Sequence, residues 1–187
     1  CASAPPAPPS PAAVTQRETP SGPVVGFEGD YGSHAWRGIP YAMPPVGAQR
    51  WRAPRPAMPW RTPRHAVEFG AACPQFASVF GGVTTAAPGT PVGSEDCLYL
   101  NVWAPPFTPE TIPQAGKQLP VMVWIHGGGN TIGEGGFYNG GNLAVTHNVI
   151  VITFNYRLGP FGWLRHAALR ADGKGSLDQS GNFGILD

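Results

Sequence analysis

Three consecutive glycines at positions 127–129 are the residues whose type and spacing most clearly suit chemistry. They follow His126 and the apolar, largely β-branched run at residues 121–125. A buried strand therefore passes directly into a loop that only residues without a side chain can build. Such a loop can turn backbone N–H groups toward one point, which suits a site where negative charge develops on an oxygen atom. The alternative is a tight turn after a core strand, although one glycine would satisfy such a turn.

The nucleophile that such a site would serve is missing from the sequence. The His-Gly-Gly-Gly form is the oxyanion-loop signature of lipases and esterases, whose serine sits in a Gly-x-Ser-x-Gly elbow. No such elbow occurs, and Ser94, Ser176 and Ser180 lack two flanking glycines. The sequence therefore predicts the charge-stabilising part of a serine hydrolase. The N–H groups of Gly128 and Gly129 are the expected donors, and Gly127 is expected to shape the loop.

The five histidines offer neither a general base nor a metal site. His126 stands at the strand end beside the glycines, where it is expected to shape the loop rather than to move protons. The other four, at positions 34, 65, 147 and 166, show no metal-ligand spacing. We therefore predict no metal site and no cofactor.

The composition is typical of one loop-rich globular domain. The 187 residues are 42% hydrophobic and include 26 glycines and 23 prolines, with a formal net charge of +1. This charge gives no general attraction to nucleic acids or membranes. Arginines and tryptophans are interleaved between residues 30 and 68, but we expect them to pair and stack within the protein rather than to bind nucleic acid. The sequence contains no run of about 18 apolar residues, which a transmembrane helix would need.

Residues 1–22 are predicted to be a Pro- and Ala-rich, disordered tether ahead of a domain that covers residues 23–187. The segment opens on Cys1 and continues as a proline-rich spacer. A first-residue cysteine before a spacer resembles a mature bacterial lipoprotein, whose signal peptide has been removed and whose cysteine carries the lipid. The protein would then be exported to the cell envelope or secreted, with the lipid on Cys1 as its only membrane contact. The alternative is a chain that happens to start at a cysteine.

The domain is predicted to alternate short strands and helices. Strands are expected at residues 24–27, 34–41, 98–103, 121–125 and 149–154. The two β-branched runs, 121–125 and 149–154, are typical of strands covered on both faces. A helix at residues 142–147 between them would complete a strand–helix–strand unit with a right-handed crossover. Further helices are expected at 161–169 and 182–187, and the strand at 149–154 is expected to be an unpaired edge of the sheet.

The cysteines leave two interpretations open. Cys73 and Cys97 enclose a loop rich in Gly, Pro, Thr and Ser, which a disulfide would stabilise by restricting the unfolded chain. Such a bond would place the protein in an oxidising compartment. Two buried free thiols are the alternative, and the spacing alone does not choose between them.

Five blocks of the sequence resemble the type-B carboxylesterase (cholinesterase-like) family. They occur in the family's order and spacing at residues 38–47, 94–103, 126–129, 155–162 and 181–187. The resemblance implies an α/β-hydrolase fold with a large mixed central sheet and helices on both faces. It also implies an N-terminal portion of the fold, because the family's serine, acid and histidine come later in the chain.

The resemblance assigns roles to two further sets of residues. Two ion pairs of the family match Arg50 with Glu95 and Arg157 with Asp187. Charged residues are tolerated inside a protein chiefly when they are paired, so these four residues are expected to be structural.

The family's first disulfide matches Cys73 and Cys97, and its oxyanion donors match Gly128 and Gly129. Cholinesterases hold a choline-binding tryptophan within that disulfide loop, where its ring attracts the quaternary ammonium. Residues 74–96 of this chain contain no tryptophan. A choline ester is therefore not expected to be the preferred substrate.

The expected function is hydrolysis of small-molecule carboxylic esters through an acyl-enzyme, with the 187-residue chain inactive on its own. Two alternatives stay open. Some members of the family keep the scaffold, lose the serine and serve as binding or adhesion modules. The chain could also be one part of a nicked enzyme whose second polypeptide supplies the triad.

Overall fold

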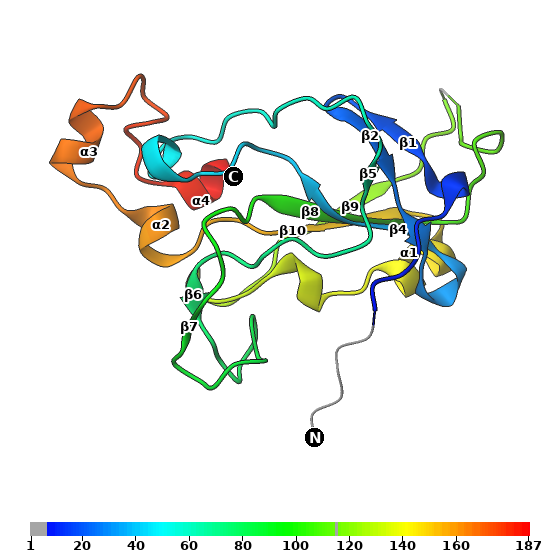
Figure 1. The fold of residues 1–187 in the computed structure, drawn as a ribbon, viewed down its shortest axis with the longest axis horizontal. Coiled ribbons are helices and arrows are strands. Elements are labelled where there is room, and N and C mark those ends of the chain that lie inside the picture. Colours follow the sequence, from blue (N-terminus) through cyan, green and yellow to red (C-terminus); the bar gives the residue numbers. More distant parts are fainter. Residues whose placement is uncertain (1–6, 115) are drawn as a thin grey trace.

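A five-stranded mixed sheet lies at the centre of the computed structural model, which describes residues 7–114 and 116–187 (Figure 1). The order across the sheet is β3 (Phe27–Glu28), β4 (His34–Pro40), β8 (Tyr99–Ala104), β10 (Ile150–Phe154) and β9 (Val121–Trp124). β9 and β10 are parallel, and the other neighbours are antiparallel. The mixed sheet agrees with the predicted fold class.

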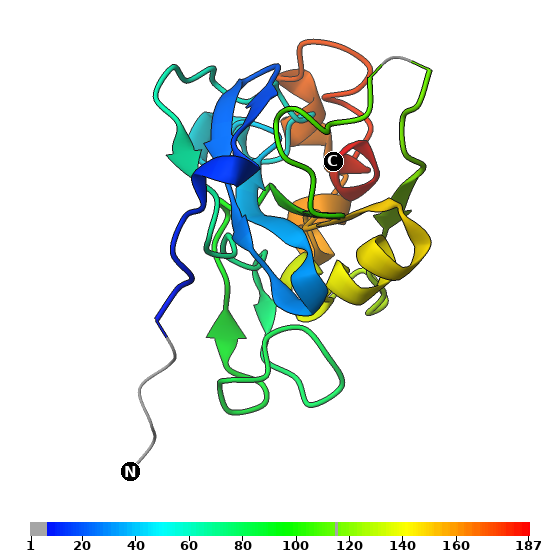
Figure 2. The ribbon, with the colours of Figure 1, turned by 90° about the vertical axis from the view of Figure 1, so that its right-hand side faces the viewer.

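The helix α1 (Gly141–His147) connects β9 to β10 and packs on one face of the sheet. Its Ala144 is fully buried against Trp103 and Val151, which are paired across β8 and β10. The helix ends at His147 and is capped by Asn148, whose positive φ of 52° is a conformation that asparagine tolerates. Figures 1 and 2 show α1 beside the turn η2 (Asp30–Gly32) that joins β3 to β4. The predicted strand–helix–strand unit is therefore present.

A small second sheet packs on the central sheet through a separate apolar cluster. It contains β1 (Arg17–Thr19), β2 (Gly22–Val25) and β5 (Arg64–His65). Val24 of β2 and Trp36 of β4 are buried together with Ala66 and Ala104. An apolar hollow of about 440 Å³ beside this cluster is bordered by residues of β8, β9 and β10.

The N-terminal segment is more ordered than the predicted tether over residues 1–22. Thr15 is fully buried in the turn η1 (Ala13–Thr15), and its carbonyl oxygen accepts a 2.9 Å hydrogen bond from the indole Nε1 of Trp36. The next residues form β1 and pair with β2. The tryptophan and the strand thus hold a segment that its composition assigns to a spacer. Cys1, the predicted lipid site, lies outside the described residues.

The remaining elements are short and lie in the connections between strands of the central sheet or after β10. β6 (Gln75–Phe76) and β7 (Pro91–Val92) form a hairpin in the loop between Cys73 and Cys97, and two further 3₁₀ turns are η3 (Gly47–Gln49) and η4 (Gly135–Phe137). After β10 come α2 (Gly159–Trp163), α3 (Ala167–Ala171) and α4 (Phe183–Leu186). The single helix expected at 161–169 is divided, because Leu164 and His166 have extended backbones. None of the helices in the described ranges is long and apolar enough to cross a membrane.

β9 forms an open edge of the central sheet, which corrects two expectations. β10 lies inside the sheet, between β8 and β9, rather than at its edge. The four residues of β9 are between 47% and 57% exposed, although their apolar run predicted coverage on both faces. The described residues therefore leave the outer edge of β9 unpaired and its side chains about half exposed.

The two expected ion pairs are present and differ in burial. Arg157 Nε donates to Asp187 Oδ2 at 2.7 Å, and both side chains are at most 3% exposed. Arg50 also pairs with Glu95 through two hydrogen bonds. Their side chains are 38% and 22% exposed, so the expectation of a buried charge holds only for Arg157 and Asp187.

A third ion pair, which the sequence did not indicate, joins the C-terminal segment to the stretch around Ala53. The buried carboxylate of Asp178 accepts hydrogen bonds from the N–H of Ala53 at 2.9 Å and of Lys174 at 3.2 Å, and it pairs with Arg55 at 2.8 Å. Burial alone would raise the pKa of this carboxyl, but these donors outweigh burial and lower the pKa below its ordinary value. Ionised Asp178 therefore stabilises the fold above the ordinary aspartate pKa, and this contribution is lost as the pH falls through the lowered pKa.

Replacing Asp178 with asparagine is expected to lower the free energy of unfolding by about 1–3 kcal/mol at neutral pH, because buried donors lose a charged acceptor. Urea unfolding followed by circular dichroism measures this change. The difference from wild type should shrink toward about pH 3, where the native carboxyl also takes up a proton. The exposed Asp172→Asn is the matched control and should change stability by less than about 0.5 kcal/mol. Equal effects of the two substitutions would contradict this role of Asp178.

Candidate active site

The glycine loop begins directly after β9 and contains backbone conformations that most residues adopt only with strain. Gly128 has a φ of +116° and Gly129 a φ of +61°. A Cβ atom at Gly128 would lie 2.0 Å from the carbonyl oxygen of Ile132, whereas one at Gly127 meets nothing within 4 Å. Asn130 continues the left-handed conformation at +60°, which asparagine tolerates. Position 128 therefore requires glycine for both its conformation and its space.

The turn after the glycines uses a carbonyl group of the loop, and the four N–H groups of residues 127–130 have no protein acceptor among the described residues. The Gly128 carbonyl oxygen accepts hydrogen bonds from the N–H of Thr131 at 3.1 Å and of Ile132 at 3.2 Å, and from the Thr131 hydroxyl at 3.0 Å. Across the described residues, the N–H groups of Gly128 and Gly129 donate to no protein atom. Both glycines are exposed. Adjacent N–H groups of this kind are suited to a negatively charged oxygen.

The side chain of His126 contacts the backbone at the start of the glycine loop. Its side chain is buried, and its ring stacks on Tyr156 with centroids 4.3 Å apart. The Tyr156 hydroxyl donates a hydrogen bond to the His126 carbonyl oxygen, and His126 Nδ1 lies 3.0 Å from the carbonyl oxygen of Gly127. Burial lowers the pKa of His126, so the imidazole is neutral near pH 7. This enclosed ring has the loop-shaping position expected of it and no access to a substrate.

A buried glutamine clamps the far end of the same loop. The Gln75 side-chain carbonyl accepts a hydrogen bond from the N–H of Gly133 at 2.9 Å, and its amide donates to the carbonyl oxygen of Gly133 at 2.9 Å. The same amide donates to the carbonyl oxygen of Cys73 at 3.0 Å. One side chain therefore satisfies both backbone groups of Gly133 and ties the disulfide loop to the glycine loop.

A second set of buried polar side chains holds Gly135. The N–H of Gly135 donates to the Asn155 side chain at 2.7 Å, and its carbonyl oxygen accepts from the Thr153 hydroxyl at 2.8 Å. The Asn101 amide donates to Thr153 at 3.1 Å, which extends the chain of hydrogen bonds across β8 and β10. Fully satisfied networks of this kind fix one conformation. The backbone from Gly133 to Gly135 is thus held against the central sheet.

The disulfide lies next to these supports. Cys73 and Cys97 are bonded, with Cα atoms 5.0 Å apart, and both are buried. They pack in one cluster with Leu98, Leu158 and Tyr156. Because Tyr156 also stacks on His126, the same cluster positions the start of the disulfide loop and the base of the glycine loop.

A cavity of about 300 Å³ opens beside the glycines. The disulfide loop lines one side through residues 79–82 and Thr84, and Gly127 and Gly128 line another. Glu134, Phe137 and Tyr138 complete its wall. This cavity is where a substrate group would lie if its carbonyl oxygen faced the N–H groups of the loop.

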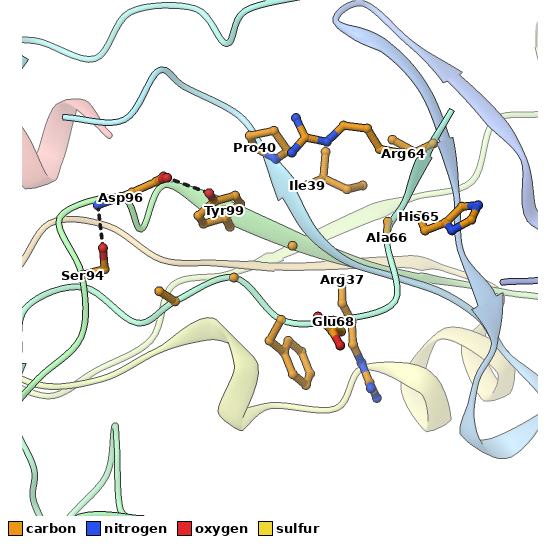
Figure 3. A pocket seen from close by; sticks show the side chains of 15 residues that line it. Arg37, Ile39, Pro40, Arg64, His65, Ala66, Glu68, Ser94, Asp96 and Tyr99 are labelled. Atoms are coloured by element: carbon orange, nitrogen blue, oxygen red, sulfur yellow. Dashed lines mark hydrogen bonds between the residues drawn. The ribbon is translucent and has the colours of Figure 1, made fainter. Parts of the chain in front are cut away.

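A separate polar cavity of about 380 Å³ shares no lining residue with the first. Figure 3 shows Tyr99 and Asp96 facing each other at one end of it, where the Tyr99 hydroxyl donates to the carboxylate at 2.9 Å. Burial and this acceptor raise the pKa of Tyr99 to about 12. Ser94 accepts from the Asp96 N–H and lies away from His65 (Figure 3). The cavity therefore contains no paired nucleophile and base.

Sequence reasoning found the glycines and missed the side chains that hold them. Gln75, Thr153 and Asn155 are not among the predicted site residues. Their side chains nevertheless hold the backbone of Gly133 and Gly135, which follows the glycine loop. The one available signal is polarity, because Asn101 and Thr153 interrupt apolar strand runs. In the described residues no group of three His, Cys, Asp or Glu side chains could hold a metal ion.

Replacing Gly128 with alanine is expected to lower the free energy of unfolding by at least about 2 kcal/mol, because the methyl group meets a backbone carbonyl in a strained conformation. Gly127→Ala is the matched control and should cost less than about 1 kcal/mol, since that position has space. Thermal and urea unfolding compare the two variants. A Gly128→Ala protein as stable as Gly127→Ala would show that the loop geometry is not required.

Residues 13–187 match the family model described as the carboxylesterase family. The chain is 46% identical over 154 residues to the para-nitrobenzyl esterase of Bacillus subtilis (strain 168), covering 80% of this chain and 29% of the esterase. It is 44% identical over 174 residues to the fumonisin B1 esterase of Sphingopyxis macrogoltabida, covering 91% and 29% of the two chains. The chain thus spans about three tenths of the length of these relatives.

Solved structures agree with the sequence relatives. A thermophilic para-nitrobenzyl esterase superposes with a TM-score of 0.74 at 39% identity, covering 93% of this chain and 33% of that one. Another para-nitrobenzyl esterase gives 0.71 at 40% identity, covering 93% and 32%. The match begins at residue 13, where the structure also places the first ordered turn. The chain belongs to the carboxylesterase family and carries part of its α/β-hydrolase fold.

Proposed function

We propose that the complete protein is a serine carboxylesterase and that this chain supplies its oxyanion-binding loop. The observation that carries the proposal is the pair of N–H groups at Gly128 and Gly129, which have no protein acceptor in the described residues. The loop that presents them is held by His126 on one side and by Gln75 on the other. A loop that served only to end a strand would not need two free donors on a fixed backbone.

The proposed reaction has two steps. A serine attacks the ester carbonyl while a histidine takes the serine proton, and the carbonyl oxygen becomes an oxyanion that accepts hydrogen bonds from Gly128 and Gly129. The alcohol leaves with a proton from the histidine, and water then hydrolyses the acyl-enzyme by the same route. Each donor typically contributes about 2.7–4 kcal/mol to transition-state stabilisation. The serine, acid and histidine would come from residues of the same protein outside these 187.

The proposed substrate is a small-molecule carboxylic ester rather than a choline ester. The named relatives include a para-nitrobenzyl esterase and a fumonisin B1 esterase, which differ widely in the esters their names describe. The disulfide loop of this chain has no tryptophan that could enclose a quaternary ammonium. Support for ester hydrolysis therefore comes from the family and from the loop, and not from any one relative.

We also propose that the protein is exported. A structural disulfide between Cys73 and Cys97 is typical of oxidising compartments. The proposed lipid on Cys1 would tether the domain to a membrane, and mass spectrometry of the native protein would detect the added acyl chains. An unmodified Cys1 in the native protein would rule out the lipid. The disulfide would then be the remaining support for the export proposal.

The complete protein is expected to hydrolyse p-nitrophenyl acetate with saturation kinetics and to be labelled by a fluorophosphonate probe. The 187-residue chain alone is expected to release no p-nitrophenolate above the buffer rate, because it has no nucleophile elbow. A burst of p-nitrophenolate from the pure 187-residue chain would contradict the proposal that the nucleophile lies outside these residues. A complete protein without turnover or labelling would instead favour an inert binding module. A second polypeptide that copurifies with the activity would indicate a nicked enzyme.

A further inference from the structure

We propose that Glu134 makes the cavity beside the glycine loop a binding site for a positively charged amine on the ester substrate. This inference rests on the proposed function, since it adds a substrate class to the same site. The cavity joins Gly127 and Gly128 to the Glu134 side of the loop, so a group bound there belongs to the molecule whose carbonyl faces the N–H donors.

The backbone on both sides of Glu134 is fixed. Gly133 is clamped by the Gln75 side chain through two hydrogen bonds of 2.9 Å. Gly135 is held by Asn155 at 2.7 Å and by Thr153 at 2.8 Å. Glu134 itself is extended, with φ −159° and ψ 149°. A carboxylate on so constrained a segment is preorganised, which reduces the entropic cost of binding a partner.

The Glu134 carboxylate lacks a cationic partner among the described residues. No Lys, Arg or His lines the cavity, and none of the three ion pairs includes Glu134. Its residue is only partly exposed, and burial raises the pKa of its carboxyl above the ordinary value. A carboxylate withdrawn from water without a partner is unfavourable, and a bound cation would offset that loss of hydration.

The rest of the cavity wall favours an amine with small alkyl substituents. Phe80 and Phe137 are 93% and 61% exposed, and Tyr138 packs on the ring of Phe137 with centroids 5.5 Å apart. Aromatic faces attract alkylammonium groups, while the carboxylate accepts the N–H hydrogen bond of a protonated amine. About 300 Å³ is at the lower end of the range for ligand sites, which limits the group to a small one.

Two pairs of isosteric esters test the proposal on the complete enzyme. The alcohol-side pair is 2-(dimethylamino)ethyl acetate and 3-methylbutyl acetate. The acyl-side pair is ethyl 3-(dimethylamino)propanoate and ethyl 4-methylpentanoate. Within each pair a protonated nitrogen replaces a CH group, so the shapes match and only the charge differs. A pH-stat at neutral pH gives kcat/KM for all four esters.

The measured quantity is the ratio of kcat/KM for the charged ester to that for its neutral isostere. In at least one pair this ratio is expected to exceed unity and to fall by about tenfold or more in Glu134→Gln, the size of one charge-assisted hydrogen bond. Glu18→Gln, an exposed acid on β1, is the matched control and should leave the ratio at its wild-type value. Glu134→Asp should retain part of the preference, because it keeps the charge.

The outcomes separate this inference from the proposed function. If the wild-type enzyme hydrolyses neutral esters but shows no preference in either pair, the cation site is wrong while the esterase stands. A preference that survives Glu134→Gln would also overturn the role of Glu134. If the complete protein hydrolyses neither the four esters nor p-nitrophenyl acetate, it is the proposed function that fails.

Discussion

The glycine loop depends on one constraint, which is that its backbone must stay fixed although no helix or strand satisfies its polar groups. Side chains meet this need. Gln75 pairs with both backbone groups of Gly133, and Asn155 with Thr153 does the same for Gly135. These bonds are buried, so their loss would leave unsatisfied groups as well as a mobile loop. The two N–H groups of Gly128 and Gly129 can remain free because the residues around them are held.

The fold brings these supports together from distant parts of the sequence. Gln75 comes from the start of the disulfide loop, Thr153 and Asn155 from the end of β10, and the glycines from the end of β9. β9 and β10 are parallel, so both of their carboxyl ends meet at one edge of the sheet. The cavity that holds Glu134 lies at this meeting point. The site is therefore a consequence of strand direction as much as of the glycines.

Much of this arrangement was open to prediction from local sequence. The β-branched runs and the three glycines specify two strands, their connecting helix and the loop, because backbone propensity and steric limits act over a few residues. The position of β10 inside the sheet and the burial of Thr15 depend on distant partners, and neither was predicted. The roles of Gln75 and Asn155 were missed for the same reason. Each side chain contacts a backbone group at least 20 residues away, and nothing in its immediate neighbours marks it.

The most direct test of the oxyanion role is a crystal structure of the complete protein after reaction with a p-nitrophenyl phosphonate ester. The phosphonyl adduct on the serine mimics the tetrahedral intermediate. Its oxygen is expected to lie about 2.7–3.1 Å from the backbone nitrogens of both Gly128 and Gly129. A phosphonyl oxygen bound by other donors, with these two N–H groups facing solvent, would contradict the central claim.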